Sequence, residues 1–238
     1  MEHIKCKPLP IANDESIAAY ARHIQNLHQL EGFSKRKSLE EMLQTFLEKL
    51  PQTYHQSGII ESAVCLGQKI SALLNDTQDE RSTHSDLNPS NVLFNGRQYY
   101  LVDWQASAKR NLYFDLACCA IFFYYHDSRL QDKFLHDYFN RKPTTDEQEK
   151  YQLMQVFVNI YYGLIFLALP FMNNESLQPF SEQQIIDLPA FDSFMQLVGA
   201  GYINIGQHKT QQQFGYIFLS KALDIISSNQ HCGALKVI

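Results

Sequence analysis

Three oxygen-bearing side chains lie close together near the middle of this 238-residue sequence. Asp86 is followed five residues later by Asn91, and Asn91 is followed twelve residues later by Asp103. Phosphoryl transfer needs an oxygen acceptor that orients the attacking hydroxyl group, and further oxygen ligands that hold magnesium against the transferring phosphate. A carboxylate, an amide and a second carboxylate supply that set, so this segment indicates phosphoryl transfer.

The segment between Asn91 and Asp103 has the pattern of a β-hairpin. Residues 92–94 and 99–102 favour strands, and the pair Asn95-Gly96 is a strong signal for a two-residue turn. A hairpin returns the chain to the point where it started. We therefore expect Asn91 and Asp103 near the same open end of the hairpin, as two ligands of one metal ion require.

The order of these residues resembles the catalytic and metal-binding loops of the protein-kinase-like phosphotransferases. The shared pattern is His-x-Asp-x-x-x-x-Asn, here His84, Asp86 and Asn91, and it is followed by a strand that ends in Asp103. The order and the spacings of these residues together carry the resemblance, which implies a kinase-like activity.

Two later segments narrow the resemblance to one superfamily. Val-Asp-Trp-Gln at 102–105 stands where protein kinases have Asp-Phe-Gly, and Tyr-Phe-Asp-Leu-Ala follows at 113–117. Both segments are similar to the aminoglycoside phosphotransferase and choline/ethanolamine kinase superfamily, nearest to its bacterial choline-kinase-like branch. The resemblance is specific over about residues 82–125 and diffuse elsewhere.

The resemblance implies a role for each matching residue. Asp86 would be the catalytic base, and Asn91 and Asp103 would hold Mg²⁺ beside the co-substrate ATP. The residues that would support the catalytic loop are His84, Asn88 and Asp115.

Three further residues are candidates for contact with the substrate. Gln105 stands where relatives of the choline-kinase type commonly carry Glu, and this difference removes one negative charge from the site. Trp104 lies beside Asp103, and aromatic faces attract the cation of a choline-like substrate. Tyr113 is a further aromatic candidate, although most Tyr side chains of a helical lobe belong to its core.

The rest of the sequence favours a mainly α fold with a small β-hairpin. Apolar residues recur at helical spacing on both sides of the hairpin, and Ser38 with Glu41 has the pattern of a capping box. A polar loop is expected over 75–83. The expected helices cover about residues 17–30, 38–50, 59–74, 114–125, 129–140, 145–169, 181–198 and 211–228. By resemblance this is the C-terminal, large helical lobe of a protein-kinase-like phosphotransferase fold.

The residues before His84 lack the pattern of the small lobe that the resemblance implies. They contain no glycine-bearing strand pair and no strand that carries a lysine. We therefore expect one C-lobe over 1–238, with the N-lobe absent, leading helices at 1–80, the catalytic hairpin at 82–105 and a helical subdomain at 106–238. An uncovered apolar cleft wall would favour a homodimer or a partner chain.

The composition and the first residues of the sequence argue against a nucleic-acid-binding, disulfide-rich or secreted protein. A net charge of −5 gives no general attraction to nucleic acid. Five cysteines without a Cys-x-x-Cys pair argue against a disulfide framework, and no basic and apolar leader follows Met1, so we expect a cytoplasmic protein. Residues 153–172 are long and apolar enough for a membrane span, but we interpret them as a buried core helix because no second span or basic flank accompanies them.

Two hypotheses of function remain. The first is an ATP-dependent kinase of a small hydroxylated molecule, most favoured as choline, ethanolamine or a related amino alcohol, with an aminoglycoside or thiamine less favoured. The second is a truncated or degenerate kinase-like module without catalysis, which acts as a binding or interaction protein. The sequence contains no Gly-x-Ser-x-Gly elbow or metalloprotease helix that would indicate a hydrolase.

Overall fold

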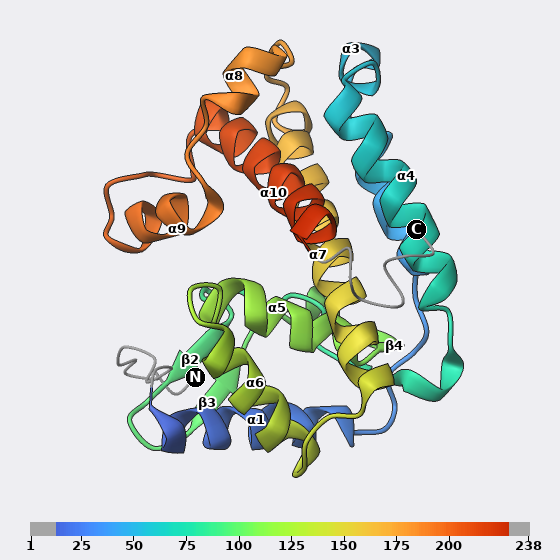
Figure 1. Ribbon diagram of the computed structural model, residues 1–238, viewed down its shortest axis with the longest axis vertical. Coiled ribbons are helices and arrows are strands. Elements are labelled where there is room, and N and C mark those ends of the chain that lie inside the picture. The colour runs from blue at the N-terminus through green and yellow to red at the C-terminus, as the bar shows by residue number, and fades with distance from the viewer. Residues whose placement is uncertain (1–12, 229–238) are drawn as a thin grey trace. The chain divides into compact units, whose positions relative to one another are not determined.

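The computed structural model describes residues 13–228, and its residue contacts divide the chain into two units. Unit 1 comprises Met1–Arg36 and Asn75–Gln155, and unit 2 comprises Lys37–Leu74 and Val156–Ile238. Helices dominate both units (Figure 1), which confirms the mainly α fold expected from the sequence.

The elements of unit 1, in chain order, are α1 (Asp14–His28), η1 (Thr77–Asp79), β1 (Glu80–Thr83), β2 (Val92–Phe94), β3 (Tyr99–Leu101), η2 (Trp104–Ala106), β4 (Ala108–Asn111), α5 (Tyr113–Phe123) and α6 (Ser128–Phe139). The elements of unit 2 are α2 (Leu39–Leu47), α3 (Gln52–His55), α4 (Gly58–Leu73), α8 (Glu182–Ile186), α9 (Phe191–Gly199) and α10 (His208–Ser228). The long helix α7 (Thr145–Met172) begins in unit 1 and ends in unit 2.

The core of unit 1 joins α1, α5 and α6. Tyr20 of α1 lies 5.5 Å from the ring of Phe123 on α5 and 6.1 Å from the ring of Phe134 on α6. Every residue of α5 is buried, and all of them except Asp115 are apolar. The apolar stripe expected along α1 is buried as far as Leu27, whereas Leu30 lies beyond the end of the helix and is 53% exposed.

Strand β1 was not expected from the sequence. It pairs antiparallel with β4, from Glu80 opposite Asn111 to Thr83 opposite Ala108. The polar loop expected over 75–83 was therefore wrong in its last part. The segment Glu-Arg-Ser-Thr has no alternation of apolar and polar residues, and pairing with a strand far along the chain fixes its conformation.

The second sheet of unit 1 is the expected hairpin. Strands β2 and β3 pair antiparallel, with Val92 opposite Leu101. The two-residue turn expected at Asn95-Gly96 was wrong, because residues 95–98 all lie between the paired strands. Asn95 stabilises this longer loop, since its side-chain oxygen accepts from the N–H groups two and three residues ahead, at 2.9 and 3.0 Å.

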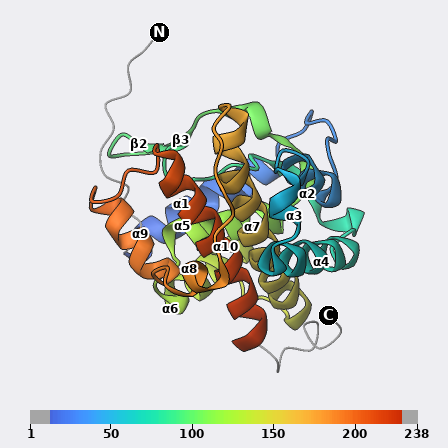
Figure 2. The same ribbon diagram turned by 90° about the horizontal axis from the view of Figure 1, so that it is seen from above.

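Unit 2 is held by a close crossing of α7 and α10, which lie side by side in Figures 1 and 2. A Cβ atom added to Gly215 of α10 would lie 2.9 Å from the carbonyl oxygen of Gly163 on α7. The rings of Phe166 and Phe214 meet at 4.5 Å across the same crossing. Elsewhere in unit 2, the capping box expected at Ser38 and Glu41 is present at the start of α2, with bonds of 3.2 and 2.7 Å.

The single helix expected over 181–198 was wrong. Helix α8 ends at Ile186, and α9 begins at Phe191. Pro189 lies between them, where it cannot donate a backbone hydrogen bond and disfavours helical backbone at the residue before it. The apolar periodicity on either side of the proline is real, but the chain bends between its two parts.

Helix α7 is, among the described residues, the one helix long and apolar enough to cross a membrane by length and composition. In its most apolar window 72% of the residues are buried inside the protein. A core helix of a globular protein passes the same test of length and composition, so this helix is weak evidence for a membrane span.

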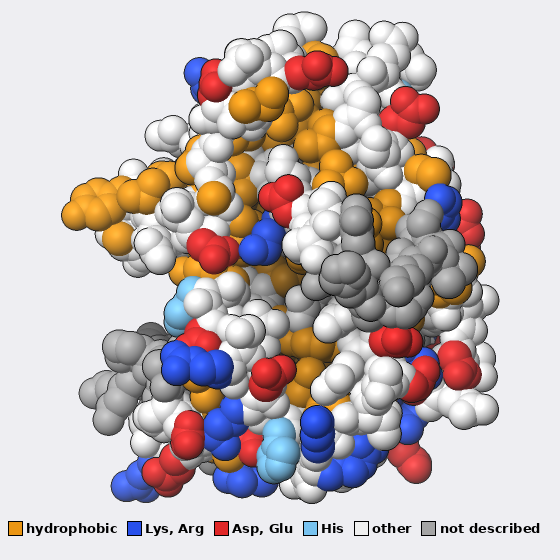
Figure 3. Space-filling view, viewed as in Figure 1, with side chains coloured by type: hydrophobic (Ala, Val, Ile, Leu, Met, Phe, Trp, Pro, Cys, Tyr) orange, Lys and Arg blue, Asp and Glu red, His pale blue; other side chains and the backbone are white. Residues whose placement is uncertain are grey.

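Exposed apolar side chains gather on α9 and on the loop that follows it. Leu197 is 40% exposed, Tyr202 is 82% exposed and Ile205 is 38% exposed. Figure 3 shows hydrophobic side chains standing out at this position. Exposed apolar surface of this kind occurs at interaction sites, but the homodimer or partner chain expected from the sequence stays a prediction.

Candidate active site

The catalytic loop of unit 1 runs from the end of β1 to the start of β2. Its centre is a set of hydrogen bonds from two amide side chains to Asp86. Asn88 donates to Oδ1 of Asp86 at 2.9 Å, and Asn91 donates to Oδ2 at 2.8 Å and to the backbone carbonyl of Asp86 at 2.9 Å. The orientation of the Asp86 carboxylate is thus set by two neighbours from the same loop.

The side-chain oxygen of Asn91, Oδ1, is available as a ligand. Because both hydrogens of its side-chain amide are used for Asp86, Oδ1 is left without a donor among residues 13–228. The carbonyl oxygen of an amide is a suitable ligand for a hard cation such as Mg²⁺.

The hairpin brings Asp103 to the same end as Asn91. The N–H of Val102 donates to the backbone carbonyl of Asn91 at 3.0 Å, and Asp103 is the next residue. Asp103 is exposed and has a left-handed backbone, with φ 61° and ψ 69°. The expectation that the turn places both residues at one open end of the hairpin is confirmed for the backbone.

The donor set suits magnesium better than a transition metal. No group of three or more His, Cys, Asp or Glu side chains is placed to hold a metal in the described part of the chain. Asn91 and Asp103 supply one amide and one carboxylate oxygen, and Mg²⁺ takes few protein ligands while keeping waters and substrate phosphates. The residues fit Mg²⁺, and their role as ligands stays a prediction.

His84 links the catalytic loop to the strand before Asp103. Its Nε2 donates to the carbonyl oxygen of Val102 at 2.9 Å, and its ring lies 4.8 Å from the ring of Trp104. The bond to Val102 requires a hydrogen on Nε2, and the buried Nδ1 has no partner among the described residues. This position fits the supporting role that the resemblance implies.

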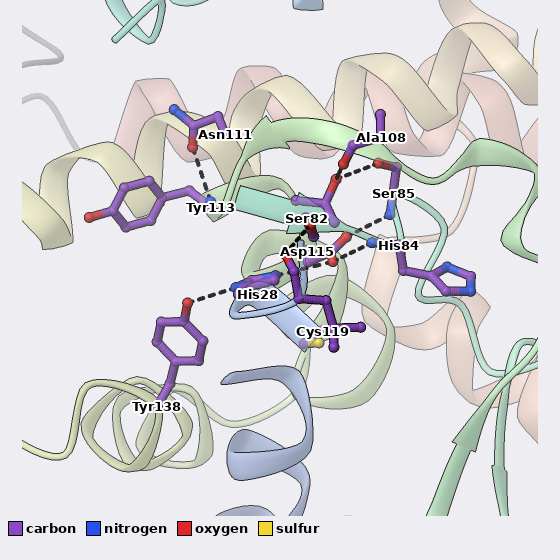
Figure 4. A network of polar contacts seen from close by, with 12 residues as sticks. His28, Ser82, His84, Ser85, Ala108, Asn111, Tyr113, Asp115, Cys119 and Tyr138 are labelled. Carbon is purple, nitrogen blue, oxygen red and sulfur yellow. Dashed lines mark hydrogen bonds and ion pairs between the residues drawn. The ribbon is translucent and has the colours of Figure 1, made fainter. Parts of the chain in front are cut away.

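Asp115 anchors the backbone of the loop from the first turn of α5 (Figure 4). It is fully buried, and its two carboxylate oxygens accept from the N–H groups of Ser85 and His84, each at 2.8 Å. Ser85 has a left-handed backbone with φ 65°, which is unfavourable for a residue with a side chain. The two bonds from Asp115 hold this conformation directly before Asp86.

The three candidate substrate residues lie in different environments. Trp104 is 40% exposed, donates from its indole N–H to the carbonyl of Leu101 at 3.0 Å, and lies beside the site. Gln105 is exposed, and the Arg36 guanidinium donates to its backbone oxygen. Tyr113 is 2% exposed, and in Figure 4 it points away from the side on which His84 lies.

Burial raises the pKa of the Tyr113 hydroxyl well above its ordinary value. The structure thus brings together Asp86, Asn88 and Asn91, and it brings His84 and Asp115 to the same loop. It does not bring Tyr113 to Asp86.

Two residues of the site were missed in the sequence. His28 contacts Asp115, with Nε2 at 3.2 Å from Oδ2, and its Nδ1 lies 2.6 Å from the hydroxyl oxygen of Tyr138. A signal was present, because His28 follows Ile24 by one helical turn and therefore lies on the buried stripe of α1. A histidine in such a stripe needs a polar partner, but the sequence does not show which residue supplies it.

Comparisons with solved structures define the class of protein. A choline/ethanolamine kinase family protein from Mesorhizobium loti is 14% identical with a TM-score of 0.64, and the match covers 98% of this chain and 71% of that chain. Choline kinase LicA from Streptococcus pneumoniae is 17% identical with a TM-score of 0.62, and the match covers 95% and 69%. A structure of LicA in complex with AMP gives 17% identity and a TM-score of 0.57, and the match covers 88% and 63%.

At these identities the likeness shows the fold, which is that of the kinase-like phosphotransferases. The model of the phosphotransferase enzyme family matches residues 10–151, more than half of the sequence. The chain therefore belongs to the phosphotransferase enzyme family, and the superfamily inferred from its motifs is confirmed. Comparison with curated protein sequences gives no match.

Proposed function

We propose that this chain transfers a phosphoryl group from ATP to the hydroxyl group of a small molecule, with a choline- or ethanolamine-like amino alcohol as the favoured acceptor. The family supports phosphotransferase activity, and the choline and ethanolamine kinases among the structural neighbours support the acceptor class. The AMP complex of LicA supports nucleotide binding by this chain. The expected cytoplasmic location belongs to the same proposal.

The observation that carries the proposal is the double use of Asn91. Its amide hydrogens orient Asp86, while its free Oδ1 remains available beside the strand that leads to Asp103. Acceptor orientation and metal binding are thereby joined in one side chain. Both are needed at the same place in phosphoryl transfer.

The proposed mechanism gives each residue one task. Asp86 accepts a hydrogen bond from the acceptor hydroxyl and takes its proton as the oxygen attacks the terminal phosphorus of ATP. The bond from that phosphorus to the bridging oxygen breaks, and ADP leaves. Asn91 and Asp103 would hold Mg²⁺, which supplies charge neutralisation on the phosphates. Asn88, His84 and Asp115 keep Asp86 in place and do not react.

Residues 13–228 form no β-rich lobe that could contact a nucleotide, because their strands form two sheets of two strands each. The absent small lobe expected from the sequence stays a prediction, and so does the activity of this chain by itself. The alternative is a kinase-like module that binds or interacts without catalysis.

Magnesium-dependent ATP consumption by the full chain, measured with a panel of amino alcohols, tests the proposal. Turnover with one of them is expected, and Asp86→Asn is expected to lower it by about 100-fold or more. Asp132→Asn is the matched control, since Asp132 is exposed and makes no ion pair in the described part of the chain. Absence of turnover in the unmodified protein, or equal turnover in Asp86→Asn, would contradict the proposal.

A thermal-shift measurement distinguishes the non-catalytic module from a kinase whose acceptor is missing from the panel. A ligand at a hundredfold its dissociation constant stabilises the folded state by about 2.7 kcal/mol. Stabilisation by ATP with Mg²⁺ is expected for the kinase. No stabilisation together with no turnover would favour the non-catalytic module.

A further inference from the structure

A buried chain of polar groups reaches the catalytic loop from two helices that carry none of the proposed catalytic residues (Figure 4). The hydroxyl of Tyr138 on α6 lies 2.6 Å from Nδ1 of His28 on α1. Nε2 of His28 lies 3.2 Å from Oδ2 of Asp115, the oxygen that accepts from the N–H of His84. The other oxygen of Asp115 accepts from the N–H of Ser85.

One arrangement of the hydrogens gives each donor of this chain of groups an acceptor. Oδ2 of Asp115 already accepts from a backbone N–H, so it faces His28 as an acceptor and Nε2 carries the hydrogen. Burial raises the pKa of the Tyr138 hydroxyl well above its ordinary value, so that group keeps its proton and donates to Nδ1. Each donor thus meets an acceptor, from Tyr138 through His28 to Asp115.

The geometry points to a task for this chain beyond core packing. Two N–H bonds from the loop reach one oxygen each of the Asp115 carboxylate, and His28 adds a third bond, to Oδ2, that ties the carboxylate to α1. Rotation of the carboxylate would release the N–H of Ser85, whose left-handed backbone is unfavourable without that bond. Displacement of Ser85 would displace its neighbour Asp86.

We propose that His28 and Tyr138 are positioning residues, which hold the Asp115 carboxylate and through it the catalytic loop. This inference rests on the proposed function only for its effect on turnover. The packing of α1 against α6 supports the arrangement, since Gln25 of α1 also donates to the backbone oxygen of Tyr138 at 3.0 Å.

Tyr138→Phe removes the hydroxyl group and keeps the ring that packs edge-on against His28 at 5.5 Å. The matched control is Tyr124→Phe, because Tyr124 is also a buried tyrosine of unit 1 and its hydroxyl has no partner among the described residues. Amide hydrogen exchange at His84 and Ser85 is the first measurement. We expect exchange about fivefold faster in Tyr138→Phe, the equivalent of one lost neutral hydrogen bond, and unchanged exchange in Tyr124→Phe.

Two substitutions of His28 separate positioning from packing. Gln keeps a donor that can reach Asp115, whereas Leu keeps bulk without a donor. We expect His28→Gln to retain most of the protection of the two loop amides and His28→Leu to lose it. The imidazole nitrogen shifts of His28 provide a spectroscopic check, because Tyr138→Phe should alter the Nδ1 signal while Tyr124→Phe leaves it unchanged.

Turnover gives the second measurement where the unmodified protein is active. Tyr138→Phe should lower kcat about fivefold and leave KM for ATP unchanged, since the loop and not the nucleotide contact is displaced. An inactive unmodified protein would overturn the proposed function, and amide exchange would then decide on positioning alone. Unchanged loop exchange in both Tyr138→Phe and His28→Leu, equal effects in Tyr124→Phe, or unchanged kcat in an active enzyme would overturn the inference.

Discussion

The side-chain amide of Asn91 donates a hydrogen bond of 2.8 Å to the carboxylate of Asp86. This bond joins the proposed base to a proposed metal ligand, so the orientations of the two side chains depend on each other. A substitution at Asn91 therefore affects both functions, and its chemistry determines which one is lost first.

Asn91→Asp keeps an oxygen ligand but removes the amide hydrogens. Two carboxylates would then lie at hydrogen-bond distance, and like charges at that distance disfavour ionisation of one of them. We expect turnover to fall by about 10-fold or more at neutral pH although a metal ligand is retained. The pH profile of kcat checks this, because kcat of the variant should reach half its maximum at a higher pH than kcat of the unmodified enzyme. An unaltered profile would contradict the prediction.

Asp103→Asn should act on the metal dependence instead. The substitution removes the one proposed charged ligand while Asp86 and Asn91 keep their hydrogen bonds. We expect the Mg²⁺ concentration for half-maximal turnover to rise by about 10-fold or more, and we expect full loss of turnover when Mg²⁺ is removed with a chelator. A titration with Mg²⁺ checks this, with Asp132→Asn as the variant that should match the unmodified protein.

The start of α7 gives a prediction for acid stability. Arg141 donates two bonds of 2.7 Å to Glu147, and with the N–H of Thr144 it lowers the pKa of that carboxyl from 4.5 to about 2, against the opposing effect of burial. A carboxyl group whose pKa is lower in the folded than in the unfolded state stabilises the folded state at pH values above the unfolded-state pKa. This stabilisation is lost as the pH falls through the folded-state pKa. Glu147→Gln should lower the free energy of unfolding by about 1 kcal/mol at pH 7.

This difference should shrink as the pH falls from about 4.5 towards 2, where Glu147 itself becomes protonated. Urea unfolding at a series of pH values measures it. Glu149→Gln on the same helix is the control, since Glu149 has no ion pair or hydrogen-bonded side chain within the described range. A pH-independent difference would show that the pair does not contribute in this way.

The close crossing of α7 and α10 predicts a steric cost within unit 2. In Gly215→Ala the new methyl group would lie 2.9 Å from the carbonyl oxygen of Gly163, and backbone at that distance cannot yield as a side chain could. We expect a loss of about 1–3 kcal/mol in the free energy of unfolding. Gly199→Ala is the control, because its methyl group would meet nothing within 4 Å, and it should be neutral or slightly stabilising.

Local patterns in the sequence were sufficient for most helices and for the hairpin. The capping box at Ser38 and Glu41 and the apolar stripe of α1 are confirmed because both depend on neighbours within a few residues. Strand β1 could not be found in this way, since its partner lies in β4 and its own sequence is polar. The break at Pro189 could have been found, because proline is incompatible with a helix interior.

In the candidate site, too, the features set by nearby residues could be predicted from the sequence, and those set by tertiary packing could not. The order of Asp86, Asn91 and Asp103 is written in the sequence, and the hairpin relates two of them through local pairing. The support from His28 and Tyr138 cannot be read from the sequence. His28 lies 87 positions from Asp115 and contacts it, and Tyr138 contacts His28, only because α1, α5 and α6 pack together. The Trp104 ring lies 4.8 Å from the ring of His84 and Gln105 is exposed, and the contact of both with an acceptor stays a prediction.

The left-handed backbone of Asp103 sets stability and function against each other at a single position. For a residue with a side chain this conformation costs about 1–2 kcal/mol, and glycine adopts it without that cost. A library of variants screened only for heat resistance would therefore be expected to accumulate Gly at position 103 and to discard the proposed metal ligand. Retention of Asp103 in a population of variants would report selection for phosphate chemistry rather than for folding.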